Sequence, residues 1–291
     1  MKVILSRKGF DTYNGGYASP ILPDDTLMSL PIPSDRDKIQ YSDLKFDNDH
    51  SYFERMKEID PRRKSNKKYI SFNERTKCHL DPDIYRYVKL RRKGWMPLFG
   101  PSGKAYTELT KEGVSVGDLF LFYGWFKRTI EKDGILEFAP KAQDLHVIFG
   151  YLQVGEIYQV ANRLSDNPTW MRYHPHVENI DRRKNRSIVY VASKFVMWDD
   201  DITGSGVFSC NENVILTKKG YPRSRWLLPE FFRKVRIYPH TSSAWREEGY
   251  FQSTSPGQEF VIEDNDKVEN WAKSLINRND QSEPESNSKE I

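Results

Sequence analysis

One stretch of the sequence decides the fold: residues 119–126, Leu-Phe-Leu-Phe-Tyr-Gly-Trp-Phe. Its apolar side chains are continuous, as expected for a strand that is covered on both faces. A turn at Lys132-Asp133-Gly134 precedes a second apolar run, Leu145–Tyr151. The two runs therefore predict a pair of buried strands around which the rest of the molecule is built.

Further elements are spread along the whole chain. β-Branched and apolar runs predict strands at residues 2–6, 187–193 and 213–216. Apolar spacing and capping residues predict helices at residues 51–59, 82–93, 106–112 and 268–276, with Asp81 as the cap of the second and Pro82 at its first position. Strands outnumber strong helical periods. We therefore predict an α+β fold with a mixed, mainly antiparallel sheet, in one variant partly barrel-like, flanked by helices.

No internal repeat and no Pro/Ser-rich linker interrupts the first 276 residues. We predict one domain over residues 1–276. Residues 277–291 are polar and acidic, and this composition predicts a disordered tail.

The composition is that of a soluble protein. Charged residues make up 30% of the chain, and no run approaches the roughly 20 apolar residues of a membrane helix. Only two cysteines occur, Cys78 and Cys210, which excludes a disulfide framework and a cysteine-rich zinc site. The sequence therefore predicts a protein of the reducing cytoplasm with no membrane partner.

The net charge of +4 is too small to establish a nucleic-acid partner, but the basic residues are clustered. The clusters are Arg62-Arg63-Lys64 with Lys67-Lys68, Arg91-Arg92-Lys93 and Arg182-Arg183-Lys184. They fit either a face that attracts phosphates or ordinary solvated loops.

The amino-terminal segment is a candidate anion site. Its relevant residues are Ser6, Arg7, Lys8, Asp11, Gly15, Gly16 and Ser19. Arginine and lysine neutralise phosphate, and glycines let backbone N–H groups approach it closely. The segment matches neither of the common glycine-rich phosphate motifs, and a surface hairpin with solvated charges is an equal alternative.

Histidines and acids form a second group of candidates. His79 with Asp81 can supply a general base or part of a metal site, although helix capping also accounts for Asp81. His146 lies within an apolar strand, where a histidine is usually a satisfied core group. His174 and His176 form a His-x-His pair, but no third or fourth ligand lies at useful spacing. The sequence therefore predicts no metal site, and it identifies no cofactor.

Tyr123 and Trp125 lie toward the end of the predicted central strand. Aromatic rings at such positions stack on a flipped or unpaired base in small PUA-like barrels. The alternative is that both rings belong to the core.

Taken together, these segments resemble the nucleotide modification associated domain 3 family. The resemblance rests on residues 3–11, 15–16, 19–23, 30–33, 79–83, 117–126, 145–148, 150–157 and 175–176. It implies a role near modified DNA in bacteria or their phages, and it supplies no catalytic residue.

Three functions remain open at this point. An enzyme or accessory factor acting on bases or nucleotides would hold phosphate with Arg7 and Lys8, move a proton with Asp11, His79 or Asp81, and contact the base with Tyr123, Trp125 or His146. The second is a non-catalytic reader of modified bases. The third is a structural or interaction subunit that works with other proteins of a modification system.

Overall fold

The structure is a computed structural model that describes residues 1–60, 72–179, 187–253 and 259–279. Its centre is the antiparallel pair β6 (Leu119–Lys132) and β8 (Leu145–Gln159), in which Phe126 lies opposite Leu145. The predicted strand pair is confirmed. β6 runs beyond the predicted end because its last residues pair with β7 (Ile135–Phe138) in a hairpin, whose Leu136 is buried in a hydrophobic cluster separate from that of the central sheet.

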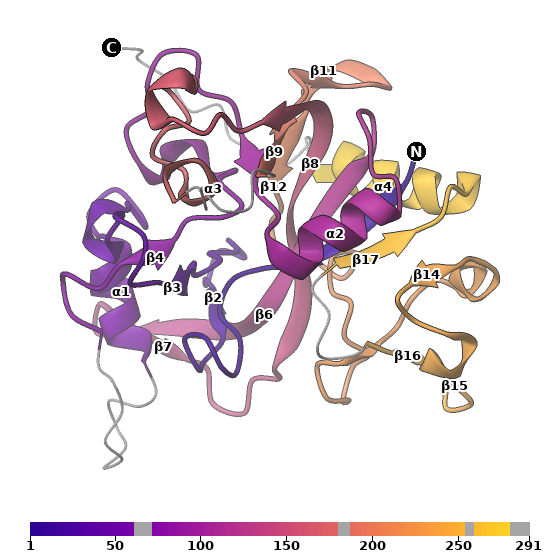
Figure 1. Ribbon diagram of the computed structural model, residues 1–291. Helices are drawn as coiled ribbons and strands as arrows, with labels where there is room; N and C mark the ends of the chain where they lie inside the picture. The colour runs from indigo at the N-terminus through magenta and orange to yellow at the C-terminus, as the bar shows by residue number, and fades with distance from the viewer. Residues whose placement is uncertain (61–71, 180–186, 254–258, 280–291) are drawn as a thin grey trace.

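The central sheet has the strand order β14-β17-β1-β6-β8-β9-β5, with β2 and β7 also paired to β6 and β12 paired to β8 (Figure 1). β1 and β2 run parallel to β6, and the other pairs of this sheet are antiparallel. The remaining strands are β1 (Val3–Arg7), β2 (Ser19–Ile21), β3 (Ile32–Pro33), β4 (Cys78–His79), β5 (Leu98–Phe99), β9 (Ile188–Ala192), β10 (Phe195–Val196), β11 (Asp199–Thr203), β12 (Ser205–Val207), β13 (Arg225–Trp226), β14 (Ile237–Tyr238), β15 (Trp245–Arg246), β16 (Tyr250–Gln252) and β17 (Glu259–Ile262).

The mixed, mainly antiparallel sheet is thus confirmed. In the part of the chain that the structure describes, the sheet does not close into a barrel. In this described sheet β14 and β5 stand at opposite ends of the strand order, so it is open, as the α+β prediction allows.

The helices are α1 (Tyr52–Ile59), α2 (Gly103–Lys111), α3 (Pro175–Glu178) and α4 (Asp266–Asn279). Short 3-10 turns occur at Tyr41–Asp43, Arg86–Val88, Leu164–Asp166, Glu230–Lys234 and Ser242–Ala244. α1 begins at Ser51, whose side chain accepts a hydrogen bond from Glu54 N in a capping box. α2 packs near β17 and α4 near β1 (Figure 1). The helices predicted at 51–59, 106–112 and 268–276 are confirmed, the last two with shifted ends.

Two predicted elements are wrong. Residues 82–93 form only the 3-10 turn at Arg86–Val88, because Asp83 exchanges both backbone hydrogen bonds with Leu98 in an extended bridge. Residues 213–216 contribute a single bridge, between Ile215 and Val147, in place of a strand.

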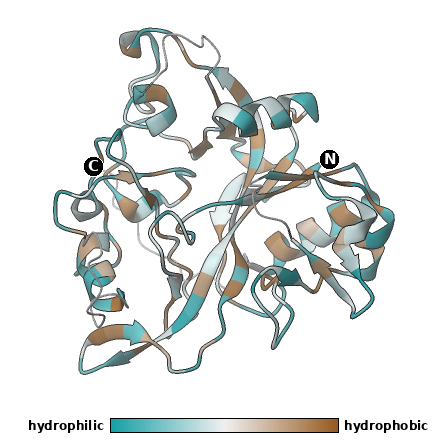
Figure 2. Cartoon of the chain, turned by 60° about the horizontal axis from the view of Figure 1, so that its bottom comes forward, coloured by the Kyte–Doolittle hydropathy of each residue, from teal (hydrophilic) through white to brown (hydrophobic). Residues whose placement is uncertain are grey.

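Three hydrophobic clusters fill the molecule. The largest lies on the central sheet, and Phe99 and Phe122 belong to it. The second surrounds α1 and includes Cys78 and Leu80, and the third, smaller cluster includes Val177. In Figure 2 hydrophobic segments run through the central strands, and the connecting loops are largely hydrophilic. Each cluster has a member beside the same place in the fold, Cys78 of β4, Phe99 of β5 and Val177 of α3, because His79 and Gly100 both lie against His176.

Several predictions fall beyond this description. The basic stretches at 62–68 and 182–184, and residues 280–291 of the predicted tail, lie outside the described residues. α4 reaches Asn279, three residues past the predicted domain end at 276. Among the described helices, none is long and apolar enough to cross a membrane.

Candidate functional site

The predicted anion site of the amino-terminal segment divides at the end of β1. Arg7 faces a cleft that also contains Tyr123 and His146. Lys8 faces the other way, where its Nζ lies 2.9 Å from Glu259 Oε1 and 4.3 Å from the centre of the Phe99 ring. Successive residues of an extended chain point to opposite faces of a sheet. The structure therefore has two polar sites, one on each side of β1.

The cleft on the Arg7 side has a volume of about 640 Å³. Its lining residues come from five parts of the chain: Arg7 and residues 10–13, Tyr123 and Trp125, residues 142–144 and His146, residues 221–224, and Ser253. A space of several hundred cubic ångströms is the usual size of a small-molecule site. Five of the predicted residues meet here: Arg7, Asp11, Tyr123, Trp125 and His146.

Two arginines and two aspartates, Asp11 and Asp144, bring charged groups to the cleft. Arg7 and Arg223 both line it, and neither forms an ion pair with a carboxylate of the described residues. Burial lowers the pKa of Arg223; the charge of Arg7 acts in the same direction, and the charges of Asp144 and Asp11 oppose it. Like charges held together in a half-buried cleft favour an anion between them. Sequence reasoning missed Arg223, because no local motif surrounds it.

Aromatic rings line the same cleft. The Arg223 guanidinium lies 4.0 Å from the centre of the Trp125 ring, and Trp125 Nε1 donates a hydrogen bond to Asp144 at 2.9 Å. Tyr13 is 93% exposed at the cleft, so its ring is available to a ligand, and it too was missed. Tyr123 is only 1% exposed. Tyr123 was expected near the end of its strand, but β6 continues to Lys132, so Tyr123 lies within the strand.

His146 is held in one tautomer. Trp226 Nε1 donates to its Nδ1 at 3.0 Å, so the proton of the neutral ring is on Nε2. Burial lowers the pKa of His146 to about 3, with the charges of Arg223 and Arg7 acting in the same direction. The ring therefore enters the cleft wall as a neutral group at physiological pH.

The other residues of the amino-terminal segment shape the turn. Asp11 Oδ1 accepts hydrogen bonds from the backbone of Tyr13 and Asn14, both at 2.7 Å. Gly15 has a φ of +90°, and a Cβ there would lie 2.2 Å from the Phe10 ring, so only glycine fits. Ser19 Oγ accepts from Leu30 N at 3.0 Å. Gly16 also has a positive φ, of +81°. Catalysis by Asp11 and ligand binding by Gly15, Gly16 and Ser19 stay predictions.

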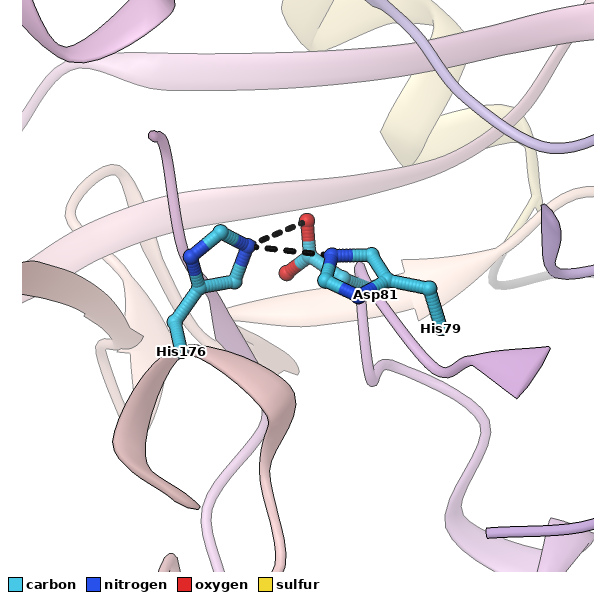
Figure 3. Close-up of side chains that lie close together, drawn as sticks. All are labelled: His79, Asp81 and His176. Atoms are coloured by element: carbon cyan, nitrogen blue, oxygen red, sulfur yellow. Dashed lines mark hydrogen bonds and ion pairs between the residues drawn. The ribbon is translucent and has the colours of Figure 1, made fainter. Parts of the chain in front are cut away.

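On the opposite side, His79 and Asp81 meet His176, the second histidine of the His-x-His pair (Figure 3). His79 comes from β4 and His176 from α3, and their Nε2 atoms lie 3.1 Å apart. His79 Nδ1 contacts Asp37 Oδ2 at 2.9 Å. Asp81 Oδ2 lies 3.7 Å from His176 Nε2. The two rings and the carboxylate point toward one another.

Asp81 has a different local role from the predicted one. It caps no helix; its Oδ1 accepts a hydrogen bond from Gly100 N at 2.8 Å, which ties β5 to the site. His174 is fully buried, with Nε2 3.3 Å from Asp81 Oδ1, and neither of its ring nitrogens has a hydrogen-bond partner of good geometry among the described residues. Ser6 Oγ, on the Lys8 side of β1, is buried without such a partner as well.

Burial governs the protonation of this histidine cluster, which we define as His79, Asp81, His174 and His176. It lowers the pKa of His176 to about 3, although the charge of Asp81 opposes the shift. Burial alone would raise the pKa of Asp81, but the neighbouring histidines and Lys8 hold it well below its usual range. Burial alone would raise the pKa of Asp37, but the hydrogen bonds from His79 and Ser34, together with the charges of His79 and His176, lower it. At neutral pH the cluster therefore presents a neutral His176 ring and an ionised Asp81.

One predicted basic cluster is partly internal. Arg91 donates to both carboxylate oxygens of Asp83, at 2.6 and 2.7 Å, and Asp83 is fully buried. The Arg91 guanidinium is therefore occupied by this internal ion pair and does not make the predicted phosphate contact. Arg92 is exposed.

Comparison with known proteins yields one match. The family model described as nucleotide modification associated domain 3 matches residues 2–263. No curated protein and no solved structure is significantly similar to the chain.

Proposed function

The chain belongs to the nucleotide modification associated domain 3 family, and from this premise we propose that its cleft binds one nucleotide unit, free or within a DNA strand. The protein then acts on or near modified bases in a bacterial or phage system. The observation that carries the proposal is the pair Arg7 and Arg223, two cations in one cleft without carboxylate ion pairs among the described residues.

The chemistry of the cleft suits each part of a nucleotide. Guanidinium groups bind phosphate through paired, charge-assisted hydrogen bonds. Trp125 and the exposed Tyr13 offer faces for a base, and base–aromatic stacking is tolerant of sequence. His146 offers a neutral ring N–H to a carbonyl or ring nitrogen of the base, because its other nitrogen is taken by Trp226.

The direct test is calorimetric titration with the four deoxynucleoside monophosphates. Hydrogen bonds to charged groups contribute about 1.5–3 kcal/mol, so Arg7→Gln and Arg223→Gln should each weaken binding by roughly 10–100-fold. Arg92→Gln is the matched control, because Arg92 is exposed and lies outside the cleft. Unchanged affinity in both cleft variants would overturn the proposal.

An enzyme is the second candidate, and the histidine cluster favours it over a passive reader. Short oligonucleotides with one modified or unmodified base, followed by mass spectrometry of their nucleosides, separate the two. A mass change that depends on His79 indicates an enzyme. Tighter binding to the modified base with no mass change indicates a reader. Binding that does not weaken as salt rises counts against both, because phosphate contacts are salt-dependent.

A further inference from the structure

Three side chains from distant parts of the sequence converge at the junction of the three hydrophobic clusters. One ligand atom from each of His79, Asp81 and His176 lies within 4.8 Å of the other two (Figure 3). We propose that these three residues bind a divalent first-row transition-metal ion. This site is on the other side of β1 from the cleft, and the proposal does not depend on nucleotide binding.

The approach of the two imidazoles is the first support. Two nitrogens that are each about 2.0–2.1 Å from one ion and 3.1 Å from each other subtend roughly 100° at that ion. This angle lies between those of octahedral and tetrahedral coordination. A direct N–H···N hydrogen bond would also bring the two rings together, but it would not account for the Asp81 carboxylate beside them.

The surroundings of His79 are the second support. A metal-binding histidine usually donates its other ring N–H to a carboxylate, which fixes the tautomer and aims the free nitrogen at the metal. Asp37 takes this position, 2.9 Å from His79 Nδ1, and it is itself only 3% exposed. Asn179 Nδ2 holds the second oxygen of Asp37 at 2.5 Å. Because His79 Nδ1 donates its proton to Asp37, the neutral ring has its lone pair on Nε2, the atom that faces His176.

Asp81 is fixed just as firmly. Gly100 N and His174 both lie against its Oδ1, at 2.8 and 3.3 Å, so Oδ2 remains for an ion. His174, fully buried and without a well-formed hydrogen bond among the described residues, is then a positioning residue for this carboxylate.

The ligand set restricts the metal. Mg²⁺ and Ca²⁺ prefer oxygen ligands, whereas two imidazoles with one carboxylate are the set of catalytic Zn²⁺ sites and of non-haem Fe²⁺ sites. Both kinds keep at least one position for water or a substrate oxygen. Local spacing in the sequence argues against a metal site because His79 and Asp81 lie 97 and 95 residues before His176.

The test is metal content and affinity of the full chain. The protein is stripped with EDTA, dialysed against Zn²⁺ or, without oxygen, against Fe²⁺, and its bound metal is measured by mass spectrometry. We expect one ion per chain. Of Zn²⁺ and Fe²⁺, the ion that is retained more tightly is the metal that the site prefers. His79→Gln and His176→Gln should bind at least tenfold more weakly. His50→Gln is the matched control, because His50 also pairs with an aspartate, Asp47 at 2.9 Å, but is not part of the cluster.

Two further measurements keep the proposal open to failure. Asp37→Asn should weaken metal affinity by about 10–100-fold, the usual effect of losing such a partner. Co²⁺ added to the unaltered protein should give visible absorption bands of nitrogen coordination, which needs no variant to fold. Wild-type protein that binds no more metal than His176→Gln, and shows no such bands, would overturn the metal site even if nucleotide binding were confirmed.

Discussion

Arg7 and Lys8 are consecutive residues whose side chains lie on opposite faces of the central sheet: Arg7 lines the cleft, and Lys8 pairs with Glu259 beside Phe99. The backbone at this point continues the ladder to β6, because Lys8 N donates to Tyr123 O at 2.8 Å. One strand end thus supplies a cation to each of the two candidate sites. A rigid strand is a more precise support for such groups than a loop.

Loss of Lys8 should destabilise the fold. Glu259 is 1% exposed, and Lys8 is its ion-pair partner at 2.9 Å. Lys8→Met leaves that carboxylate buried and uncompensated, and breaking such a pair typically costs about 3–5 kcal/mol. Urea denaturation followed by tryptophan fluorescence measures this cost. The double variant with Glu259→Met should recover most of the stability. A double variant as unstable as the single one would show that the pair is not the cause.

Arg91 should prove structural, in contrast to its neighbour. Its guanidinium holds both oxygens of the fully buried Asp83 and donates to Tyr173 Oη at 2.8 Å. Arg91→Ala should lower the free energy of unfolding by about 3–5 kcal/mol. Arg92→Ala should change it by less than about 0.5 kcal/mol, because Arg92 is exposed. Equal effects of the two substitutions would contradict this assignment.

Continuous apolar runs made the centre of the fold predictable. The strands around Phe122 and Ile148 are buried on both faces and carry no competing signal, and the chain folds as expected there. Pro82 is the counterexample. Its position after Asp81 is typical of a helix start, but Asp83 gains more from the backbone of Leu98 and from Arg91 than a helix would offer. The conformation of that segment is therefore set by tertiary contacts, which a local sequence pattern does not contain.

The candidate sites were predictable only in part, for a related reason. Arg7, His79 and Asp81 stand out because Arg7 and His79 end strands and Asp81 follows one, and side chains at such places often form sites. Arg223 lies in an irregular segment 216 residues from Arg7, and His176 lies 97 residues from His79. Spacing along the chain carries no signal for contacts of this kind. The prediction of no metal site considered only ligands close to one motif, and His79 and Asp81 are far from His176 along the chain.

The stability of the protein should fall as the solution is acidified below about pH 6.5. His146 has its pKa lowered from 6.5 to about 3 in the folded state, chiefly by burial. Between these values the unfolded chain binds a proton that the folded chain does not, so falling pH favours unfolding, by up to about 1.4 kcal/mol per pH unit. His146→Asn retains an acceptor for Trp226 Nε1 but does not titrate. Its stability curve between pH 6.5 and 5 should be less steep than that of the wild type, and parallel curves would refute this origin.

Gly100 should be required for the histidine cluster even though it is no ligand. A Cβ at this position would lie 2.4 Å from the His176 ring, with the His176 Cβ at 2.6 Å, so the whole side chain would have to move. Gly100→Ala should therefore separate His176 Nε2 from His79 and weaken Zn²⁺ binding at least tenfold, while the Arg7 cleft keeps its nucleotide affinity. Gly103→Ala is the matched control on the same segment, because nothing lies within 4 Å of a Cβ there. Its φ of +52° costs some stability, but metal affinity should not change. Normal Zn²⁺ affinity in Gly100→Ala would mean that His176 is not held in the position on which the proposed metal site depends.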